Sequence, residues 1–487
     1  MTEATELDGV AETDEPVPAP APAKPKRKFD RSITDGPLPS AVWKIAWPAV
    51  LTNLISGVQG WVDQIMVGNL IGVQANAAIG AAFQIFLLVI TFVGSIFIGM
   101  SVLVSRFTGM DDHEKVNRSV YQGFLTAAFI SLGILAPIGY FASPYLLSLV
   151  ADADVKAEAL PFLRIMFTCS FGMLIYFIMS GSLRAAGDAK TPMILGIVMT
   201  VLNLIFNIVL IRGLGPIHAF GTAGAAIGNC LSSGLVGIYA IYKLYSGTWV
   251  VAFPKSGYAP DWKVIKKLFS FGLPAGIQGI AMNAGGVLMY AFMGSLAQGK
   301  ATQAVYAVAY GQLFLLVTWS SNALMGASAA VTGQNLGAGH PDRANAAPRT
   351  AAMLGISGAA FVGLFFFFMP GMLLSLFGMR DPAVVEIGSE LLRVLAVSGF
   401  FISTALAYTG GLQGSGDTKS PLFISIISQV VVPLSICFVI KNVSTLQPIH
   451  IWLAILAGHM TRAALSVGRF LQGKWRSIVV DIETTKA

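Results

Sequence analysis

Long apolar stretches separated by short polar ones follow one another from residue 41 to residue 476. We count twelve, and each has at least the roughly 20 residues that an α-helix needs to cross the hydrocarbon core of a bilayer. The pattern therefore predicts an all-α polytopic membrane protein with twelve transmembrane helices. The expected helices span about 42–70, 77–105, 119–141, 160–184, 191–212, 221–245, 267–296, 303–331, 348–370, 388–412, 421–440 and 449–470.

Composition supports this interpretation. Of the 487 residues, 55% are hydrophobic and only 11% are charged, and the mean hydropathy is +0.71. A soluble domain carries about 25% charged residues, so this chain lacks the polar groups to cover a globule. Composition excludes a soluble enzyme, a secreted disulfide scaffold and a nucleic-acid-binding protein. The net charge of +7 therefore has to be placed relative to the bilayer.

The first 40 residues differ from the rest of the chain. Eight acids precede and overlap a Pro/Ala stretch and the basic cluster KPKRK, so we expect a disordered cytoplasmic tail over 1–40. Assigning the 31 Lys and Arg residues to alternating sides puts 24 on the side of the N-terminus and 7 on the other. This bias predicts that both termini are cytoplasmic, with 477–487 as a C-terminal cytoplasmic tail.

The two halves of the chain match each other at an offset of 226 to 229 residues. RAAGDAKTPM at 184–193 faces QGSGDTKSPL at 413–422, and SRFTGMDDHEKVN at 105–117 faces GQNLGAGHPDRAN at 333–345. We therefore expect two six-helix lobes, 41–250 and 251–476, related by a pseudo-two-fold axis along the membrane normal. Two such bundles can rock about a central cavity and so expose it to alternate sides of the membrane.

These motifs, with WVDQIMVGNLIG at 61–72, NLIFNIVLI after the GD motif and GRFLQGKW at 468–475, resemble the multidrug and toxic compound extrusion (MATE) family. The resemblance covers about residues 38–476. It implies a twelve-helix, two-lobe secondary transporter that exports amphipathic, often cationic compounds, driven by inward flow of H⁺ or Na⁺. It implies no cofactor and a multi-pass protein of the inner or plasma membrane. We expect a monomer.

Asp63 is the strongest candidate for the coupling site, because it is the only acid well inside a predicted span. A carboxylate there costs several kcal/mol unless it is partnered or neutralised. Thr52, Ser56, Gln59 and Asp63 are spaced to share one helix face. Lipid would penalise that polar stripe, so it should face the bundle interior or a cavity. The alternative is that Asp63 lies at an outer helix end and is merely hydrated.

Three more residues, Asn203, Asn207 and Pro48, are expected to take part in coupling with Asp63. Asn203 and Asn207 are one turn apart on the fifth span and match a family position pair in which some members have Asn then Asp. With Asp63 they would supply oxygens for Na⁺, although one carboxylate suits a proton at least as well; ordinary interhelical hydrogen bonds are the alternative. In the DinF-like branch of the family, protonation of the matching Asp is proposed to bend this helix at the matching proline, here Pro48.

The C-terminal half departs from the NorM-like branch, which has an acid on the seventh helix; here no acid lies between Asp261 and Asp342. The chain therefore resembles the DinF-like branch more closely. Substrate contacts are expected from aromatic, Met and amide side chains of the seventh and eighth helices, although packing is the simpler role for each. The candidates are Gln278, Met282, Asn283, Met289, Tyr290, Tyr310 and Trp319.

Two other functions compete with export. A flippase for lipid-linked or other amphipathic lipids would need a strongly cationic cavity, and no Lys or Arg lies in the middle of the first, second, seventh or eighth span. An intramembrane enzyme would need a nucleophile–base pair or metal ligands inside the bilayer, and neither HExxH nor GxSxG is present. We therefore expect a transporter and no enzyme.

Overall fold

The computed structural model describes residues 29–149, 152–214, 216 and 218–482, and every element in these ranges is helical. The first half contains α1 (Ser32–Asp35), α2 (Leu38–Leu70), α3 (Val73–Gly94), α4 (Ile96–Gly109), α5 (His113–Ala128), η1 (Phe129–Leu135), α6 (Ala136–Ser148), α7 (Ala153–Thr168), α8 (Phe171–Ala185), α9 (Lys190–Arg212) and α10 (Gly221–Ser246). The second half contains α11 (Trp262–Gly294), α12 (Gly299–Val308), η2 (Ala309–Leu313), α13 (Leu315–Gly337), α14 (Pro341–Phe368), α15 (Pro370–Ser375), α16 (Pro382–Ser415), α17 (Lys419–Ile426), η3 (Ile427–Val431), α18 (Val432–Val443), α19 (Pro448–Leu471) and η4 (Lys474–Ser477).

The expected spans correspond to these helices. Nine helices of the described residues are long and apolar enough to cross a membrane, and two bent pairs, α7 with α8 and α12 with α13, raise the number to eleven. The one remaining predicted span, the seventh at 267–296, is α11, whose 33 residues occupy the place in the second half that α2 has in the first. The twelve-helix, two-lobe fold is therefore confirmed.

The two GD motifs form the same turn in each half. Gly187 and Gly416 have φ values of +97° and +100°, which glycine adopts at little cost and which end α8 and α16. The following aspartates accept hydrogen bonds from backbone N–H groups at the start of the next helix, Asp188 from Thr191 at 3.0 Å and Asp417 from Ser420 at 3.1 Å. Both motifs therefore act as helix-to-helix turns.

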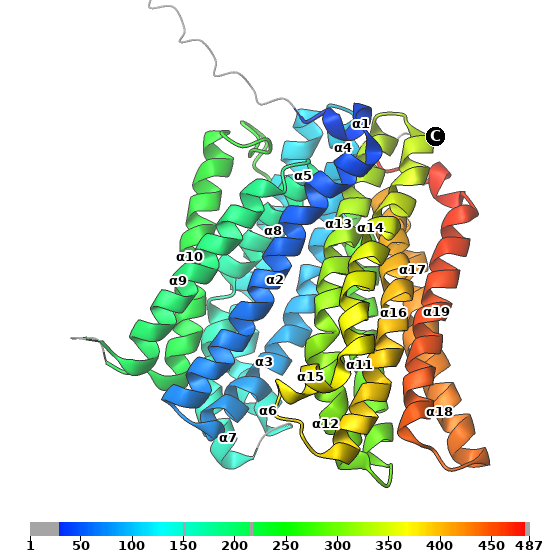
Figure 1. Ribbon diagram of the computed structural model, residues 1–487. Coiled ribbons are helices and arrows are strands. Elements are labelled where there is room, and N and C mark those ends of the chain that lie inside the picture. The colour runs from blue at the N-terminus through cyan, green and yellow to red at the C-terminus, as the bar shows by residue number, and fades with distance from the viewer. Residues whose placement is uncertain (1–28, 150–151, 215, 217, 483–487) are drawn as a thin grey trace, which may run out of the picture.

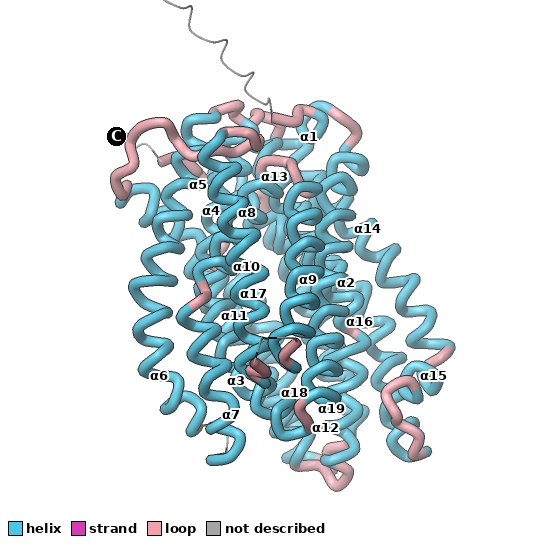
Figure 2. Tube along the Cα trace, turned by 90° about the vertical axis from the view of Figure 1, so that its left-hand side faces the viewer, coloured by secondary structure: helices cyan, strands magenta, loops and turns pink. Residues whose placement is uncertain are grey.

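The two lobes lie side by side, with the blue-to-green first half and the green-to-red second half on opposite sides of Figure 1. The first long helix of each lobe packs on the other lobe. Helix α2 contacts α13, and α11, its equivalent in the repeat, contacts α4. Gly109 and Gly337, which the repeat pairs, meet where α4 and α13 end, and a Cβ atom on Gly337 would lie 3.0 Å from Cα of Gly109. The tube view shows the same long helices running between the two ends of the bundle (Figure 2).

The segments next to the termini lie together at one end of the bundle, which we call the tail face (Figure 1). The N-terminal segment is held by the second lobe, since Arg343 donates a hydrogen bond to the carbonyl oxygen of Gly36 at 2.7 Å. The C-terminal segment is held by the first lobe, since Arg106 donates to the carbonyl oxygen of Ile478 at 3.0 Å and Lys115 pairs with Asp481 at 3.3 Å. The repeat pairs Lys115 with Arg343, so equivalent cations fasten opposite ends of the chain.

This packing differs from the expected disorder of 1–40 over its last part. Residues 1–28 lie outside the described residues, but Ile33 of α1 is fully buried among side chains of both lobes. Val480 and Ile482, in the expected C-terminal tail, are also buried against the first lobe. Composition suggested disorder for residues 1–40 because that segment is polar overall, yet it carries Ile33, for which the two lobes provide a pocket.

Replacing Gly337 with Ala should destabilise the contact between the lobes, because the added Cβ would overlap the carbonyl oxygen of Arg106. Overpacking of this kind costs about 1–3 kcal/mol. The matched control is Gly358→Ala on α14, where an added Cβ meets open space. We expect the thermal unfolding midpoint in detergent micelles to fall for Gly337→Ala only. Equal midpoints for the two variants would contradict this close packing.

Candidate functional site

Asp63 faces the fifth predicted span from within the first lobe. The side chains of Gln59 and Asp63 are one helical turn apart on α2, and both contact α9. Asn207 of α9 donates a hydrogen bond to a carboxylate oxygen of Asp63 at 2.9 Å. The carboxylate is half-buried, and no Lys or Arg pairs with it among the residues that the structure describes. Neutral donors therefore take the place of a counter-charge.

The hydrogen bonds continue along α9 as a chain of neutral groups. Asn207 also donates to the side-chain oxygen of Asn203 at 3.2 Å, and Gln59 donates to the same oxygen at 2.8 Å. Thr200 donates to the oxygen of Gln59 at 2.8 Å. The structure thus brings together the four polar residues that the sequence analysis grouped as a coupling site, although their role stays a prediction. They are Asp63, Gln59, Asn203 and Asn207.

Within this hydrogen-bond network, two buried side-chain atoms have no hydrogen-bond partner: Nδ2 of Asn203 and Oδ1 of Asn207. A buried amide oxygen without a donor is costly. A protonated Asp63 carries an O–H donor that an ionised Asp63 lacks, and the two amide atoms of Asn207 can exchange places by rotation about one bond. The amide next to Asp63 can therefore serve either protonation state, accepting from the carboxylic acid or donating to the carboxylate.

The position of Asn207 depends on a glycine of α10. A Cβ atom on Gly228 would overlap Oδ1 of Asn207, so only glycine leaves room for this amide. A groove of about 310 Å³ runs between α2 and α9 beside the same network, lined by Asp63, Gln59 and Thr200 and otherwise by apolar side chains.

Pro48 lies within α2, and its carbonyl oxygen accepts a hydrogen bond from the hydroxyl of Thr52 at 2.7 Å. It is fifteen residues, about four turns, from Asp63. The structure has α2 as one helix from Leu38 to Leu70. A bend at Pro48 therefore remains a prediction.

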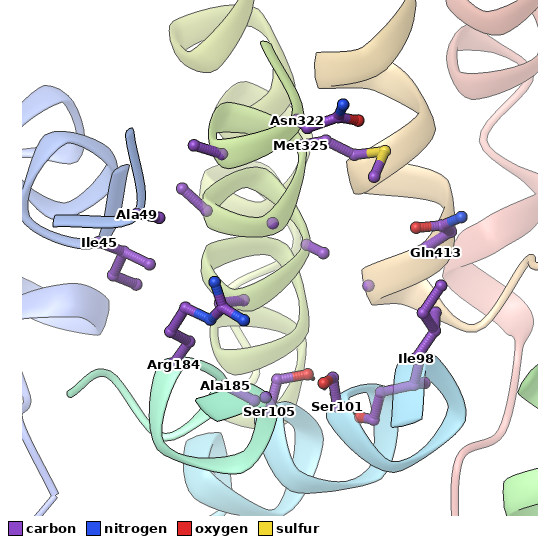
Figure 3. Close-up of a pocket in the computed structure, with 18 of the residues that line it drawn as sticks. Ile45, Ala49, Ile98, Ser101, Ser105, Arg184, Ala185, Asn322, Met325 and Gln413 are labelled. Atoms are coloured by element: carbon purple, nitrogen blue, oxygen red, sulfur yellow. Dashed lines mark hydrogen bonds between the residues drawn. The ribbon is translucent and has the colours of Figure 1, made fainter. Parts of the chain in front are cut away.

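A second cavity, of about 200 Å³, lies between the lobes (Figure 3). Helices α2, α4 and α8 of the first lobe and α13 and α16 of the second contribute its walls. Arg184 and Gln413, which the repeat pairs, both line it, from α8 and α16. The cavity therefore lies at the pseudo-two-fold axis. In Figure 3 Arg184 is near Ser105 of α4, with Gln413 across the cavity.

The expected substrate residues do not line this cavity. Gln278 is buried and donates to Ser425 of the same lobe at 2.8 Å, and Met289 is buried in the core of the second lobe. Tyr310 stacks on Tyr306 with ring centroids 4.8 Å apart. Trp319 lies against Gly57, where the first lobe meets the second.

The remaining candidates of α11 are also dispersed. Asn283 is exposed and bonds to the carbonyl oxygen of Gly279 on its own helix at 2.9 Å, Tyr290 is exposed, and Met282 is partly exposed. Residue type and helix number alone could not show which face of α11 meets the other lobe.

Several site residues were missed in the sequence. Thr200 is three residues before Asn203, so helical spacing would have placed it on the same face. Arg184 and Gln413 stand at equivalent places in the two GD motifs, which is a signal that they share an axis. Gly228 could not be found in this way, because its role depends on the packing of α10 against α9.

Comparison with known proteins decides the family. The MatE family model matches residues 48–209 and 274–439, which together make up more than half of the chain and correspond to the two repeats. The chain belongs to the MatE family. This confirms the resemblance stated from the sequence, and it places the protein among transporters.

Relatives and solved structures agree with this assignment. The probable multidrug resistance protein NorM of Thermotoga maritima is 26% identical over 451 residues, covering 90% of this chain and 93% of that protein. The probable multidrug resistance protein YoeA of Bacillus subtilis is 26% identical over 434 residues, covering 88% and 92%. An outward-facing MATE transporter structure superposes with a TM-score of 0.84 at 20% identity, covering 92% of this chain and 98% of that one, which shows the shared fold.

Gly228→Ala should impair export as strongly as Asn207→Ala, because the added Cβ displaces the Asn207 amide from Asp63. The matched control is Gly234→Ala, two turns further along α10, where an added Cβ has open space. We expect at least a tenfold lower rate of ethidium efflux from cells for Gly228→Ala and an unchanged rate for Gly234→Ala. Full efflux by Gly228→Ala at normal expression would show that the hydrogen bond to Asp63 is dispensable.

Proposed function

We propose that this MatE-family transporter is a secondary antiporter that exports amphipathic organic compounds in exchange for H⁺ or Na⁺, with Asp63 as the coupling carboxylate. The observation that carries the proposal is the contact of Asp63 with Asn207 and with no cation of the described residues. A carboxylate held by neutral groups in a membrane helix gains or loses a proton with a large change in its local interactions.

The coupling step follows from this geometry. With Asp63 ionised, the N–H group of Asn207 donates to it and α2 is tied to α9. With Asp63 protonated, the bond to Asn207 becomes one between two neutral groups, which is weaker than the charge-assisted bond, so the tie between the helices weakens. Helix α2 also packs on α13 of the other lobe. A shift of α2 relative to α9 therefore alters the contact between the lobes. Pro48 is the point at which we expect α2 to bend.

The proposal includes finer expectations. Both termini, and with them the tail face, are cytoplasmic, and the protein is a monomer in the inner or plasma membrane. It belongs to the DinF-like branch, since the only acid in the middle of a span is in the first lobe. If the coupling ion is Na⁺, oxygens of Asp63, Asn203 and Asn207 are the ligands. The family resemblance implies cationic substrates, whereas the cavity between the lobes is lined by one cation, Arg184, and by no acid of the described residues.

A lipid flippase remains the alternative function. It would need a strongly cationic cavity, whereas Arg184 is the single cation among the described residues that line the cavity between the lobes. One cation is fewer than a lipid-linked pyrophosphate would require for neutralisation.

Asp63→Asn should abolish ion-coupled efflux of an ethidium-like dye while expression stays intact, because the amide cannot titrate. The matched control is Glu386→Gln, which neutralises an exposed acid at the start of α16. We expect drug resistance of cells to fall to the level of an empty vector for Asp63→Asn and to be unchanged for Glu386→Gln. Full resistance with Asp63→Asn would refute the assignment.

The coupling ion is identified by dye efflux from vesicles that contain the purified protein. A proton-coupled antiporter should respond to an imposed pH gradient with no Na⁺ present, and a sodium-coupled one should respond to an inward Na⁺ gradient at constant pH. Efflux that responds to neither gradient would contradict secondary antiport.

A further inference from the structure

The cavity between the lobes is lined by a cationic side chain that has no acidic partner among the described residues. Arg184 of α8 lines it, and the Nε–H of Arg184 donates to the carbonyl oxygen of Ser180 at 3.1 Å. No carboxylate is within ion-pair distance of its guanidinium in the described part of the chain. The two terminal nitrogens therefore keep their donors for the cavity, which Arg184 borders together with Ser101 and Ser105 (Figure 3).

A guanidinium withdrawn from bulk water loses solvation that a neutral carbonyl oxygen replaces only in part. Carboxylate and phosphate groups compensate it best, since two parallel N–H groups match two oxygens of either anion. The hydroxyl groups of Ser101 and Ser105 donate to carbonyl oxygens of their own helix, at 3.0 Å and 3.1 Å, so the donors that face the cavity are those of Arg184. The chemistry of this end of the cavity therefore favours an anion and disfavours a cation.

The other end of the cavity is neutral. Asn322 of α13 and Gln413 of α16 line it with the thioether of Met325, and Figure 3 shows all three across the cavity from Arg184. The repeat pairs Arg184 with Gln413, so the axis relates a cation on one lobe to a neutral amide on the other. A ligand that carries charge at one end and apolar or amide-bonding groups at the other matches this asymmetry.

We propose that the cavity between the lobes binds the anionic group, a carboxylate or a phosphate, of the exported amphiphile at Arg184, with the remainder of the molecule against the second lobe at Met325 and Gln413. The inference rests on the proposed export function and specifies its substrates as anionic or zwitterionic amphiphiles. It assigns Arg184 a binding role separate from ion coupling at Asp63, because Asp63 does not line this cavity.

The test uses the purified full-length protein in detergent and three dansyl probes that differ only in their head group. Dansyl-β-alanine carries a carboxylate, its amide is neutral, and dansyl-ethylenediamine carries an ammonium group. We expect the wild type to bind the carboxylate probe at least tenfold more tightly than the amide, as a charge-assisted hydrogen-bonded pair would give. Arg184→Gln should remove that preference, and Arg184→Lys should keep part of it.

Two controls keep the result interpretable. Arg349→Gln, which neutralises an exposed arginine of α14, should leave the preference unchanged. Thermal unfolding midpoints show whether each variant is folded, and if Arg184→Gln does not fold, Arg184→Lys and the wild-type probe series decide. Equal binding of the carboxylate and amide probes by the wild type, or tighter binding of the ammonium probe, would overturn the proposal.

A free anion is the remaining alternative occupant. If inorganic phosphate alone raises the unfolding midpoint of the wild type but not of Arg184→Gln, and the probe preference is absent, the site holds a small ion and the amphiphile proposal is wrong. Loss of efflux in Asp63→Asn tests the proposed antiport by itself, so the two proposals fail by different results.

Discussion

A negative charge inside a membrane helix has to be compensated by its neighbours, and in this protein neutral amides provide that compensation. Asn207 contacts Asp63 directly, and Gln59, Asn203 and Thr200 continue the chain of hydrogen bonds across α2 and α9. Because a counter-charge would hold the carboxylate permanently ionised, neutral partners are what leave it free to change its protonation state. Gly228 is part of this arrangement although it carries no polar side chain, since it makes the space for the amide.

The duplicated architecture places the helix that carries Asp63 at the contact between the two lobes. Helices α2 and α11 each cross to the opposite lobe, and the terminal segments are fastened by the equivalent cations Lys115 and Arg343. The lobes have nevertheless diverged chemically. The first contains Asp63, whereas the interior of the second contains Arg462, which is buried near stacked aromatic rings. Under the proposed coupling at Asp63, the first lobe responds to the ion and the second does not.

The fold could be predicted from the sequence because apolar length, the bias of Lys and Arg and the repeat each constrain the same arrangement. The Asp63 group was predictable for a related reason, since residues at helical spacing share a face whatever the tertiary structure. The cavity between the lobes was not. Its walls come from five helices, and periodicity does not show which side of α11 or α13 meets the other lobe. Gln278 and Met289 were therefore expected at the central cavity, whose walls in the structure do not include them. The order of residues 29–37 was missed because burial of Ile33 depends on a pocket that both lobes form.

The central claim, that the state of Asp63 sets the relation between the lobes, is tested most directly by a distance measurement. Spin labels on Asp154 at the start of α7 and on Arg380 just before α16, exposed residues of the first and second lobe, would report the separation of the lobes in a background without the three native cysteines. Double electron–electron resonance on the protein in lipid nanodiscs should show a distance distribution that changes between pH 5 and pH 8 in the otherwise unaltered chain, and a single pH-independent distribution in Asp63→Asn. The same pH-dependent change in both proteins would contradict the account.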